Sequence, residues 1–543
     1  MSAFAARCRR IAGYLLRDHP GLYLFAAVAC LYFATMSREV PWGDARPAYE
    51  VALSMVRGDG VSVPTRWPSD APPGRGGRFY AAQPWLPSLA HLPGAALRAT
   101  LGRLAPGPEV AHLLDVLSCH LAGGLLGALA AWLFFQLCLR HGATRQVARF
   151  AAVLLAAGSI LWVYARYPFT EIVQVVCFTG FFLELAQLGK RLDRRTAIAA
   201  GLWAGMLLNT KYIYALCLPG ALLVLALVHR KDLRQLARTL MYATAGLLPG
   251  VAMLLSYNYL RFGSVTSTGY QKVGDVMVEN VLLSLWGFLF SPGKSIFLYA
   301  PPLVLAALGL RRFWRQHRST VLLMLATIAP LLLFYGRLPS WPGDWAWGPR
   351  YLVVAVPVLL LPVIGFLPGL RWPGRTLAAC VLVLGICVQL LGNAFYWDHY
   401  LRIALEARTK WLGQADRTGS LTRDKGGFCE GCFEDVYPTV WLPPFQPILG
   451  HLWLLRHVPF EDTWQEASRD APWRRHTRLD LDGRGTYQRV RMDHWLYDTR
   501  EHRLAGWLVL ILLVGVGTGA SVVFIRRTRP GSDGERLAPP GLL

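Results

Sequence analysis

The feature that most constrains this chain is a series of apolar runs, each about 20 residues long, separated by short loops rich in arginine. Of the 543 residues, 54% are apolar and only 16% are charged, whereas soluble proteins carry nearer a quarter charged residues. A run of this length is long enough for a helix to cross the hydrocarbon core of a bilayer. The sequence therefore predicts a polytopic α-helical membrane protein rather than a string of soluble domains.

Twelve membrane-spanning segments are predicted from these runs. They lie near residues 21–37, 111–138, 149–165, 169–189, 196–209, 213–228, 239–260, 296–310, 320–336, 351–370, 376–395 and 505–525. The first run follows a cluster of arginines and has no small-residue cleavage site, so we interpret it as an uncleaved signal anchor.

The loops between the spans fall into two sets, of which one is short and basic. Its members are Arg140–Arg149, Lys190–Arg195, Arg230–Arg238, Arg311–Arg318, Arg371–Arg375 and the tail from Arg526. The positive-inside rule places these loops and both termini in the cytoplasm. The formal charge of +23 follows from these clusters, so nucleic-acid binding is not expected. The Ala- and Arg-rich composition is typical of a GC-rich bacterium, and we expect the plasma (inner) membrane.

The other set faces the periplasm or exterior and includes two long segments. The first outer loop covers residues 38–110, and the segment Asp398–Arg503 contains 16 Lys/Arg and 16 Asp/Glu. About 100 residues suffice for a small folded domain, here expected to be of mixed structure. We therefore divide the chain into a transmembrane catalytic module (1–397), an extracytoplasmic domain (398–504), and a last span with a cytoplasmic tail (505–543).

Cysteine usage agrees with this topology. Cys429 and Cys432 are the two cysteines of the outer domain, as a Cys-Glu-Gly-Cys pair. In an oxidising compartment this pair predicts a structural disulfide. A metal would need two further ligands at suitable spacing, and no second pair exists, so no metal site is predicted.

Asp44 lies just outside the first span, where an amphipathic helix over Tyr49–Val56 is predicted to lie on the membrane surface. Aspartate is a favoured helix N-cap, and Pro47 stands in the first turn, so capping alone would explain the residue. The functional interpretation is a general base at the membrane surface. Both interpretations stay open at this point.

Charged residues also occur in the other outer turns: Arg166, Glu171, Lys211, Lys294 and Arg350. Any one of the cations is explained by snorkelling to the interface. The positive-inside rule, however, places excess Lys and Arg on the cytoplasmic face. Several cations on the outer face are therefore not explained by topology. Cations with Trp and Tyr nearby suit a phosphate-bearing lipid and a sugar ring.

The order of these features resembles a known family. After the surface helix come Gly58-Asp59-Gly60, then Gly77-Arg78-Phe79-Tyr80, Pro84, Leu86-Pro87 and Leu92-Pro93. Five further segments contribute to the resemblance: Leu161–Glu171, Gly201–Tyr214, Leu285–Pro301, Trp341–Leu352 and Pro443–His451. Together they resemble the large-loop GT-C glycosyltransferases, which include protein O-mannosyltransferase-like and aminoarabinose-transferase-like membrane enzymes (glycosyltransferase 39 or 83 type).

The resemblance implies an inverting transfer of a sugar from a polyprenyl-phosphate donor in the outer leaflet. The acceptor would be a hydroxyl of a cell-envelope glycan, lipid or protein. Asp44 would be the general base. Donor-binding residues would be Lys211, Arg350, Lys294, Arg166, Glu171 and Tyr80, with His451 on the acceptor side.

Some positions depart from the family pattern. Many relatives carry a second acid where this chain has Ala45, and some aminoarabinose-type members have an acid and a lysine where it has Ala81, Ala82 and Gln83. A lone carboxylate is a weak site for Mg²⁺ or Mn²⁺, so no cofactor is predicted to be required.

Two other functions stay open. A transporter or flippase of lipid-linked sugars would need charges near the bilayer midplane and paired half-membrane repeats, and the chain has no clear inverted repeat. A non-catalytic membrane scaffold would bind a partner through Asp398–Arg503 and leave Asp44 dispensable.

Overall fold

The computed structural model describes residues 20–40, 45–64, 71–104, 107–270, 280–343, 346–411, 438–458, 467, 469–473, 490–498 and 503–528. In these ranges the secondary structure is helical, and β-structure is limited to isolated bridges. Six helices there are long and apolar enough to cross a membrane: 110–140, 170–188, 233–262, 318–335, 372–394 and 506–527. The prediction of a polytopic helical membrane protein is therefore confirmed, and the number of twelve spans stays a prediction.

Most α-helices of the membrane part overlap the predicted spans. They are α2 (Pro20–Ala34), α5 (Pro108–Arg140), α6 (Arg145–Ala156), α7 (Leu161–Ala165), α8 (Thr170–Leu188), α9 (Arg194–Leu208), α10 (Cys217–Val228), α11 (Leu233–Phe262), α12 (Val281–Phe290), α13 (Ile296–Tyr299), α14 (Leu303–Gln316), α15 (Arg318–Tyr335), α16 (Val356–Leu360), α17 (Val363–Phe366), α18 (Trp372–Ala394) and α24 (Arg503–Arg527). The 3₁₀ turns η3 (Tyr212–Leu216) and η5 (Arg350–Ala355) precede α10 and α16.

Three predicted spans are interrupted. Span 149–165 forms α6 and α7, span 296–310 forms α13 and α14, and span 351–370 forms η5, α16 and α17. In the second, the break falls at Pro301-Pro302. Proline has no backbone N–H and clashes with the preceding turn, so it ends or divides a helix.

The helix α12 was not predicted, because its residues lie between the predicted spans 239–260 and 296–310. Its ten residues are too few to cross a bilayer. It exposes Leu282, Trp286 and Phe290, with exposed fractions of 73%, 58% and 56%.

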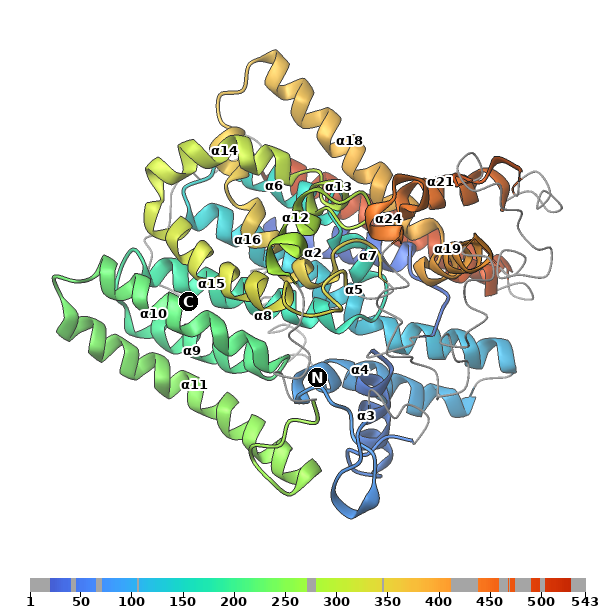
Figure 1. Ribbon diagram of the computed structural model, residues 1–543, viewed down its shortest axis with the longest axis horizontal. Helices are drawn as coiled ribbons and strands as arrows, with labels where there is room; N and C mark the ends of the chain where they lie inside the picture. The colour runs from blue at the N-terminus through green and yellow to red at the C-terminus, as the bar shows by residue number, and fades with distance from the viewer. Residues whose placement is uncertain are drawn as a thin grey trace, which may run out of the picture.

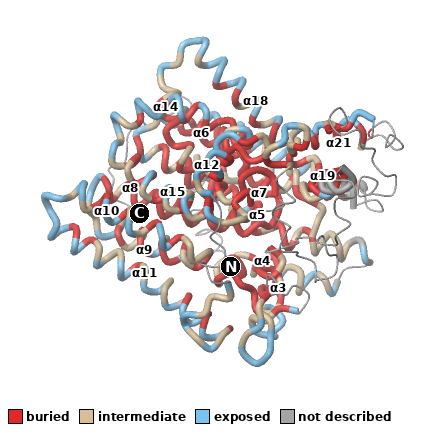
Figure 2. Tube along the Cα trace, viewed as in Figure 1, coloured by how far each residue is buried: buried red, intermediate tan, exposed pale blue. Residues whose placement is uncertain are grey.

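Helices α5, α7 and α8 lie near the centre, and α11 and α18 lie at the periphery (Figures 1 and 2). The central helix α8 is buried along almost its whole length. By contrast, α24 leaves Ile511 and Leu512 more than half exposed. Apolar side chains on the outside and a packed interior are expected of a helical bundle surrounded by lipid.

Close packing of α9 on α11 depends on glycines. A Cβ on Gly201 of α9 would lie 1.9 Å from the carbonyl oxygen of Ala243, and one on Gly246 of α11 would lie 2.2 Å from that of Ile198. Small residues allow helix backbones in membranes to approach closely and pack without a hydrophobic driving force.

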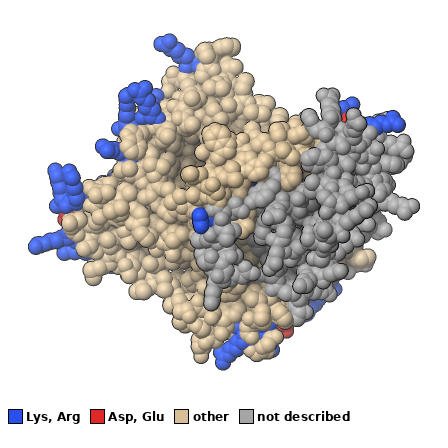
Figure 3. All heavy atoms as spheres, in the orientation of Figure 1, with Lys and Arg blue, Asp and Glu red and all other residues tan. Residues whose placement is uncertain are grey.

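Loops predicted to be basic lie together in the structure. The α10–α11 turn, the α14–α15 turn and the start of α18 lie at the left and top of Figure 1. Lysine and arginine side chains lie along this rim in Figure 3, and others lie at the lower and right edges of the view. The helices α3 (Ala45–Arg57), α4 (Trp85–Leu101), α19 (Trp397–Trp411) and α21 (Pro447–His457) lie toward the opposite side.

These four helices belong to the outer segments predicted from the sequence. The helix α3 contains the predicted surface helix and packs against α4, which in turn packs on α5. The described residues of the C-terminal outer segment form a small aromatic core of Tyr400, Phe445, Trp453 and Trp473. Its α21 packs on α18, so this segment rests on the membrane helices.

Candidate functional site

Five side chains from four places in the sequence meet at one end of α8. We call them the Lys211 cluster: Glu171 in the first turn of α8, Lys211 before η3, Tyr335 at the end of α15, and Arg350 and Tyr351 at the start of η5. Glu171, Lys211 and Arg350 were predicted site residues, and the structure brings these three together. The two tyrosines were not predicted.

A buried ion pair forms one half of the cluster. The Nε atom of Arg350 lies 2.7 Å from Oε1 of Glu171, and their side chains are only 8% and 3% exposed. The Arg350 guanidinium also lies 5.4 Å from the centre of the Phe169 ring. Oε2 of Glu171 is buried without a hydrogen-bond partner among the described residues. An orphaned carboxylate oxygen in a buried site can accept a hydrogen bond from a ligand hydroxyl.

The ammonium group of Lys211 forms the other half. It lies 5.5 Å and 5.1 Å from the ring centres of Tyr335 and Tyr351. These rings are parallel and stacked, with centres 4.3 Å apart. In the part of the chain that the structure describes, this ammonium has no carboxylate or hydrogen-bond partner. It is a half-buried cation held by aromatic faces and open to an anion.

Gly348 and Lys294 hold the loop that carries Arg350. Gly348 has a φ of +65°, and a Cβ there would lie 2.6 Å from the Tyr299 ring. The Nζ atom of Lys294 donates hydrogen bonds to the carbonyl oxygens of Ala346 and Gly348, at 2.8 Å and 3.1 Å. Lys294 is fully buried. In the structure Lys294 shapes the Arg350 loop, and its contact with the donor phosphate stays a prediction.

Replacing Lys294 with methionine is expected to lower the free energy of unfolding by about 1–3 kcal/mol. The change removes the Lys294 donor from two buried carbonyl oxygens, of which that of Gly348 still accepts from the backbone N–H of Arg350. Thermal unfolding in detergent measures this effect, with the exposed Lys231→Met as the matched control. A stable Lys294→Met protein that has lost donor affinity would instead restore the phosphate-binding role.

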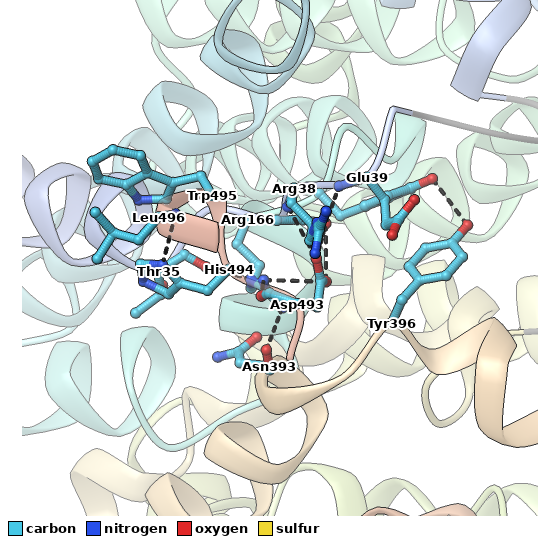
Figure 4. A network of polar contacts seen from close by, with 12 residues as sticks. Thr35, Arg38, Glu39, Arg166, Asn393, Tyr396, Asp493, His494, Trp495 and Leu496 are labelled. Carbon is cyan, nitrogen blue, oxygen red and sulfur yellow. Dashed lines mark hydrogen bonds and ion pairs between the residues drawn. The ribbon is translucent and has the colours of Figure 1, made fainter. Parts of the chain in front are cut away.

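Arg166 also lies outside the Lys211 cluster. Its guanidinium donates to the backbone carbonyls of Thr35, Asn393 and Asp493, and it forms a 3.2 Å ion pair with the Asp493 carboxylate. Figure 4 shows these groups converging from separate parts of the chain. Both side chains are at least 96% buried, with exposed fractions of 3% and 4%. Arg166 therefore links three separate segments of the chain, and its secondary contact with the donor phosphate stays a prediction.

The Asp493 carboxylate fixes the start of the first outer loop. It accepts hydrogen bonds from the Ser37 hydroxyl at 2.7 Å and from the backbone N–H of Arg38 at 3.0 Å. Asp44 itself lies outside the described residues, between this anchored stretch and the start of α3 at Ala45. The chain is therefore held on both sides of the predicted base.

The next part of the first outer loop is connected to the Lys211 region through Arg261, a residue that the sequence analysis did not select. The guanidinium of Arg261 donates to the carbonyls of Ala81 and Gln83 and to the Tyr212 hydroxyl, next to Lys211. Arg261 is fully buried. These contacts fix the buried Arg261 cation against the backbone of the first outer loop.

Tyr80, predicted in the donor site, borders this connection. Its ring lies edge-on to Phe262 with centres 6.1 Å apart, and its hydroxyl donates to the Arg75 carbonyl at 3.1 Å. The backbone N–H of Leu86 donates to the Asn209 carbonyl at 3.0 Å. The first outer loop thus lies beside the segment that carries Lys211.

His451, predicted on the acceptor side, is completely buried against the Trp347 ring, 4.6 Å between centres. Its Nδ1 lies 2.8 Å from the Leu391 carbonyl, and burial lowers the pKa of His451 to about 4. It is therefore neutral near pH 7. Its place is behind the Arg350 loop, where it packs rather than faces an open surface.

Cys429 and Cys432 lie outside the described residues. In the described ranges seven cysteines are free thiols. In those same ranges, groups of three or more His, Cys, Asp or Glu side chains placed to hold a metal ion are absent.

Comparison with known proteins gives matches among solved structures. ArnT from Cupriavidus metallidurans bound to undecaprenyl phosphate matches with a TM-score of 0.47 and 14% identity, covering 93% of this chain and 77% of ArnT. Its apo state matches with a TM-score of 0.47 and 16% identity, covering 96% and 78%. No family model and no curated protein matches the sequence. The chemistry of the site therefore follows from this chain's own residues.

Proposed function

We propose that this protein is an inverting glycosyltransferase that takes a sugar from a polyprenyl-phosphate donor and transfers it to a hydroxyl group. The observation that carries the proposal is the Lys211 ammonium, held over two stacked tyrosines beside the buried Arg350–Glu171 pair. Lysine and arginine at the end of apolar helices suit the phosphate of a lipid whose chain lies in the bilayer. Tyrosine faces and the free oxygen of Glu171 suit a sugar ring and its hydroxyls.

The proposed reaction forms one bond and breaks one. The acceptor hydroxyl oxygen attacks the anomeric carbon while Asp44 takes the hydroxyl proton. The bond from the anomeric carbon to the phosphate oxygen breaks on the opposite face, which inverts the configuration. The leaving polyprenyl phosphate carries the bonding electrons away, and Lys211 and Arg350 stabilise the developing negative charge. Glu171 holds Arg350 in place for this contact.

We also propose that the site faces the periplasm or exterior. The Lys211 cluster lies at the start of α8 and the end of α15, whereas the predicted cytoplasmic loops begin at the other ends of these helices. The division into a catalytic module over 1–397 and an outer domain over 398–504 is part of this proposal. Because the Asp493 segment anchors the first outer loop, the outer domain would support the base as well as the acceptor.

Replacing Lys211 with glutamine is expected to weaken the binding of a polyprenyl-phosphate sugar by about 10- to 100-fold. The change removes the charge and keeps a polar side chain of similar length. The measurement is transfer by purified protein from radiolabelled polyprenyl-phosphate sugars, with the Michaelis constant for the donor compared between variants. Lys231→Gln, in a predicted cytoplasmic loop, is the matched control and should bind the donor as wild type does. Equal donor affinity in both variants would contradict the proposed phosphate site.

A further inference from the structure

A second basic site lies at the opposite end of α8 from the Lys211 cluster. A pocket of about 500 Å³ opens there, between the ends of α5 and α8 and the α14–α15 turn. Its polar lining includes Arg140, His141, Lys190, His317, Arg318 and Thr320. The proposed sugar transfer uses none of these residues.

The charges of this pocket do not balance. Of its three cations, Arg140 is paired with a carboxylate, that of Glu184, at 2.8 Å. The Lys190 ammonium donates to the Arg140 backbone carbonyl at 2.8 Å. The Arg318 guanidinium lies 5.7 Å from the centre of the Trp314 ring, and within the described ranges it has no ion pair. Two positive charges therefore face the pocket without a counter-charge.

The surroundings add hydrogen-bonding groups rather than further charge. His141 Nδ1 lies 2.8 Å from the Leu137 carbonyl, and its Nε2 lies 3.1 Å from the Thr320 hydroxyl. Burial lowers the pKa of His141 to about 3, so its ring is neutral. Burial and the nearby Arg140 lower the pKa of Lys190 to about 8. An anion in the pocket would relieve this repulsion between cations.

The place of the pocket indicates where its anion comes from. The helix α8 has 19 residues and is therefore about 28 Å long at about 1.5 Å per residue, close to the thickness of a hydrocarbon core. Glu171 stands at one end and Lys190 just beyond the other. The pocket thus lies at the level of lipid headgroups, and α14 and α15 beside it expose Leu308 and Leu325.

We propose that this pocket binds the phosphate of an anionic phospholipid headgroup on the membrane face opposite to the Lys211 cluster. Lys190 and Arg318 supply the charge, and Thr320 supplies a hydroxyl. A bound headgroup links the end of α8 to the beginning of α15, and the far ends of these two helices carry Glu171 and Tyr335. A soluble phosphate would make the same contacts as a headgroup phosphate. The exposed apolar side chains of α14 and α15 favour a lipid over a soluble phosphate.

The test uses the full-length protein in detergent with phosphatidylglycerol, phosphatidylcholine or inorganic phosphate added. Lipid binding is measured by native mass spectrometry and by the rise in thermal unfolding temperature. The variant Lys190→Gln/Arg318→Gln is expected to bind phosphatidylglycerol about 10- to 30-fold more weakly, since two cations near the headgroup are lost. The control Lys231→Gln/Arg234→Gln removes the same charge from the exposed α10–α11 turn and the first turn of α11, on the predicted cytoplasmic face.

The expected result is preferential stabilisation of wild type and control by phosphatidylglycerol, lost in the Lys190→Gln/Arg318→Gln variant. That variant should unfold at the wild-type temperature without lipid, which shows that it folds. Stabilisation by inorganic phosphate alone would overturn the lipid assignment. Equal phosphatidylglycerol binding by both double variants would overturn the site.

Discussion

Asp44→Asn protein is expected to transfer sugar about 10²- to 10⁴-fold more slowly than wild type, the range that a positioned general base contributes. Asparagine caps a helix as well as aspartate does, so α3 should keep its N-terminus. It cannot accept the proton of the acceptor hydroxyl. Turnover of a radiolabelled polyprenyl-phosphate sugar under saturating donor is the measurement.

The control for this prediction is Asp59→Asn, which removes an exposed carboxylate from the same outer loop. It should transfer sugar at the wild-type rate. Donor affinity should be unchanged in Asp44→Asn, because the phosphate contacts are assigned to Lys211 and Arg350. An Asp44→Asn protein with full turnover would leave the residue as a helix cap and move the base elsewhere.

Asp493→Ala protein is expected to be destabilised by about 3–5 kcal/mol, the usual cost of leaving one partner of a buried ion pair without the other. Arg166 would stay buried with its charge uncompensated, and Ser37 would lose its acceptor. Thermal unfolding in detergent should show this as a clearly lower transition temperature. Since Asp493 also fixes the backbone at Arg38, transfer activity should fall together with stability.

A matched control is available on the same outer segment. Asp398 pairs with Arg402 at 2.6 Å, but the Arg402 side chain is 55% exposed. Exposed helical pairs of this spacing contribute about 0.3–0.5 kcal/mol, so Asp398→Ala should unfold almost as wild type does. An equal fall in the unfolding temperature of Asp493→Ala and Asp398→Ala would mean that the buried Arg166–Asp493 pair contributes no more stability than the exposed pair.

The membrane helices could be predicted from the sequence because apolar length and arginine placement are local properties. Runs such as 169–189 and 376–395 correspond to α8 and α18 within a few residues. The short helix α12 could not be identified in this way, since ten apolar residues do not reach across a bilayer. Proline interruptions at Pro301 and Pro302 were visible in the sequence, but their effect on helix division was not predicted.

The site was predictable only in part, because the role of a cation depends on its tertiary neighbours. Lys211 and Arg350 were selected from their places in outer turns, and in the structure Lys211 lies against Tyr351, the neighbour of Arg350. Lys294 and Arg166 also lie in predicted outer turns, yet each donates hydrogen bonds to backbone carbonyl oxygens of distant segments. Arg261 was not selected because the sequence shows it only as a basic residue near the end of an apolar run. Its hydrogen bond to the Ala81 carbonyl joins residues 180 positions apart, and such a contact cannot be seen in the local sequence.

The most direct test of the central claim is to locate the lipid phosphate on the protein. Undecaprenyl phosphate carrying a photoreactive diazirine near its phosphate would be irradiated with purified protein, and the labelled peptides mapped by mass spectrometry. The account predicts labelling around Tyr212, Tyr335 and Tyr351, strongly reduced in Lys211→Gln but not in Lys231→Gln. Labelling confined to other regions, such as the pocket at Lys190, or unaffected by Lys211→Gln, would contradict it.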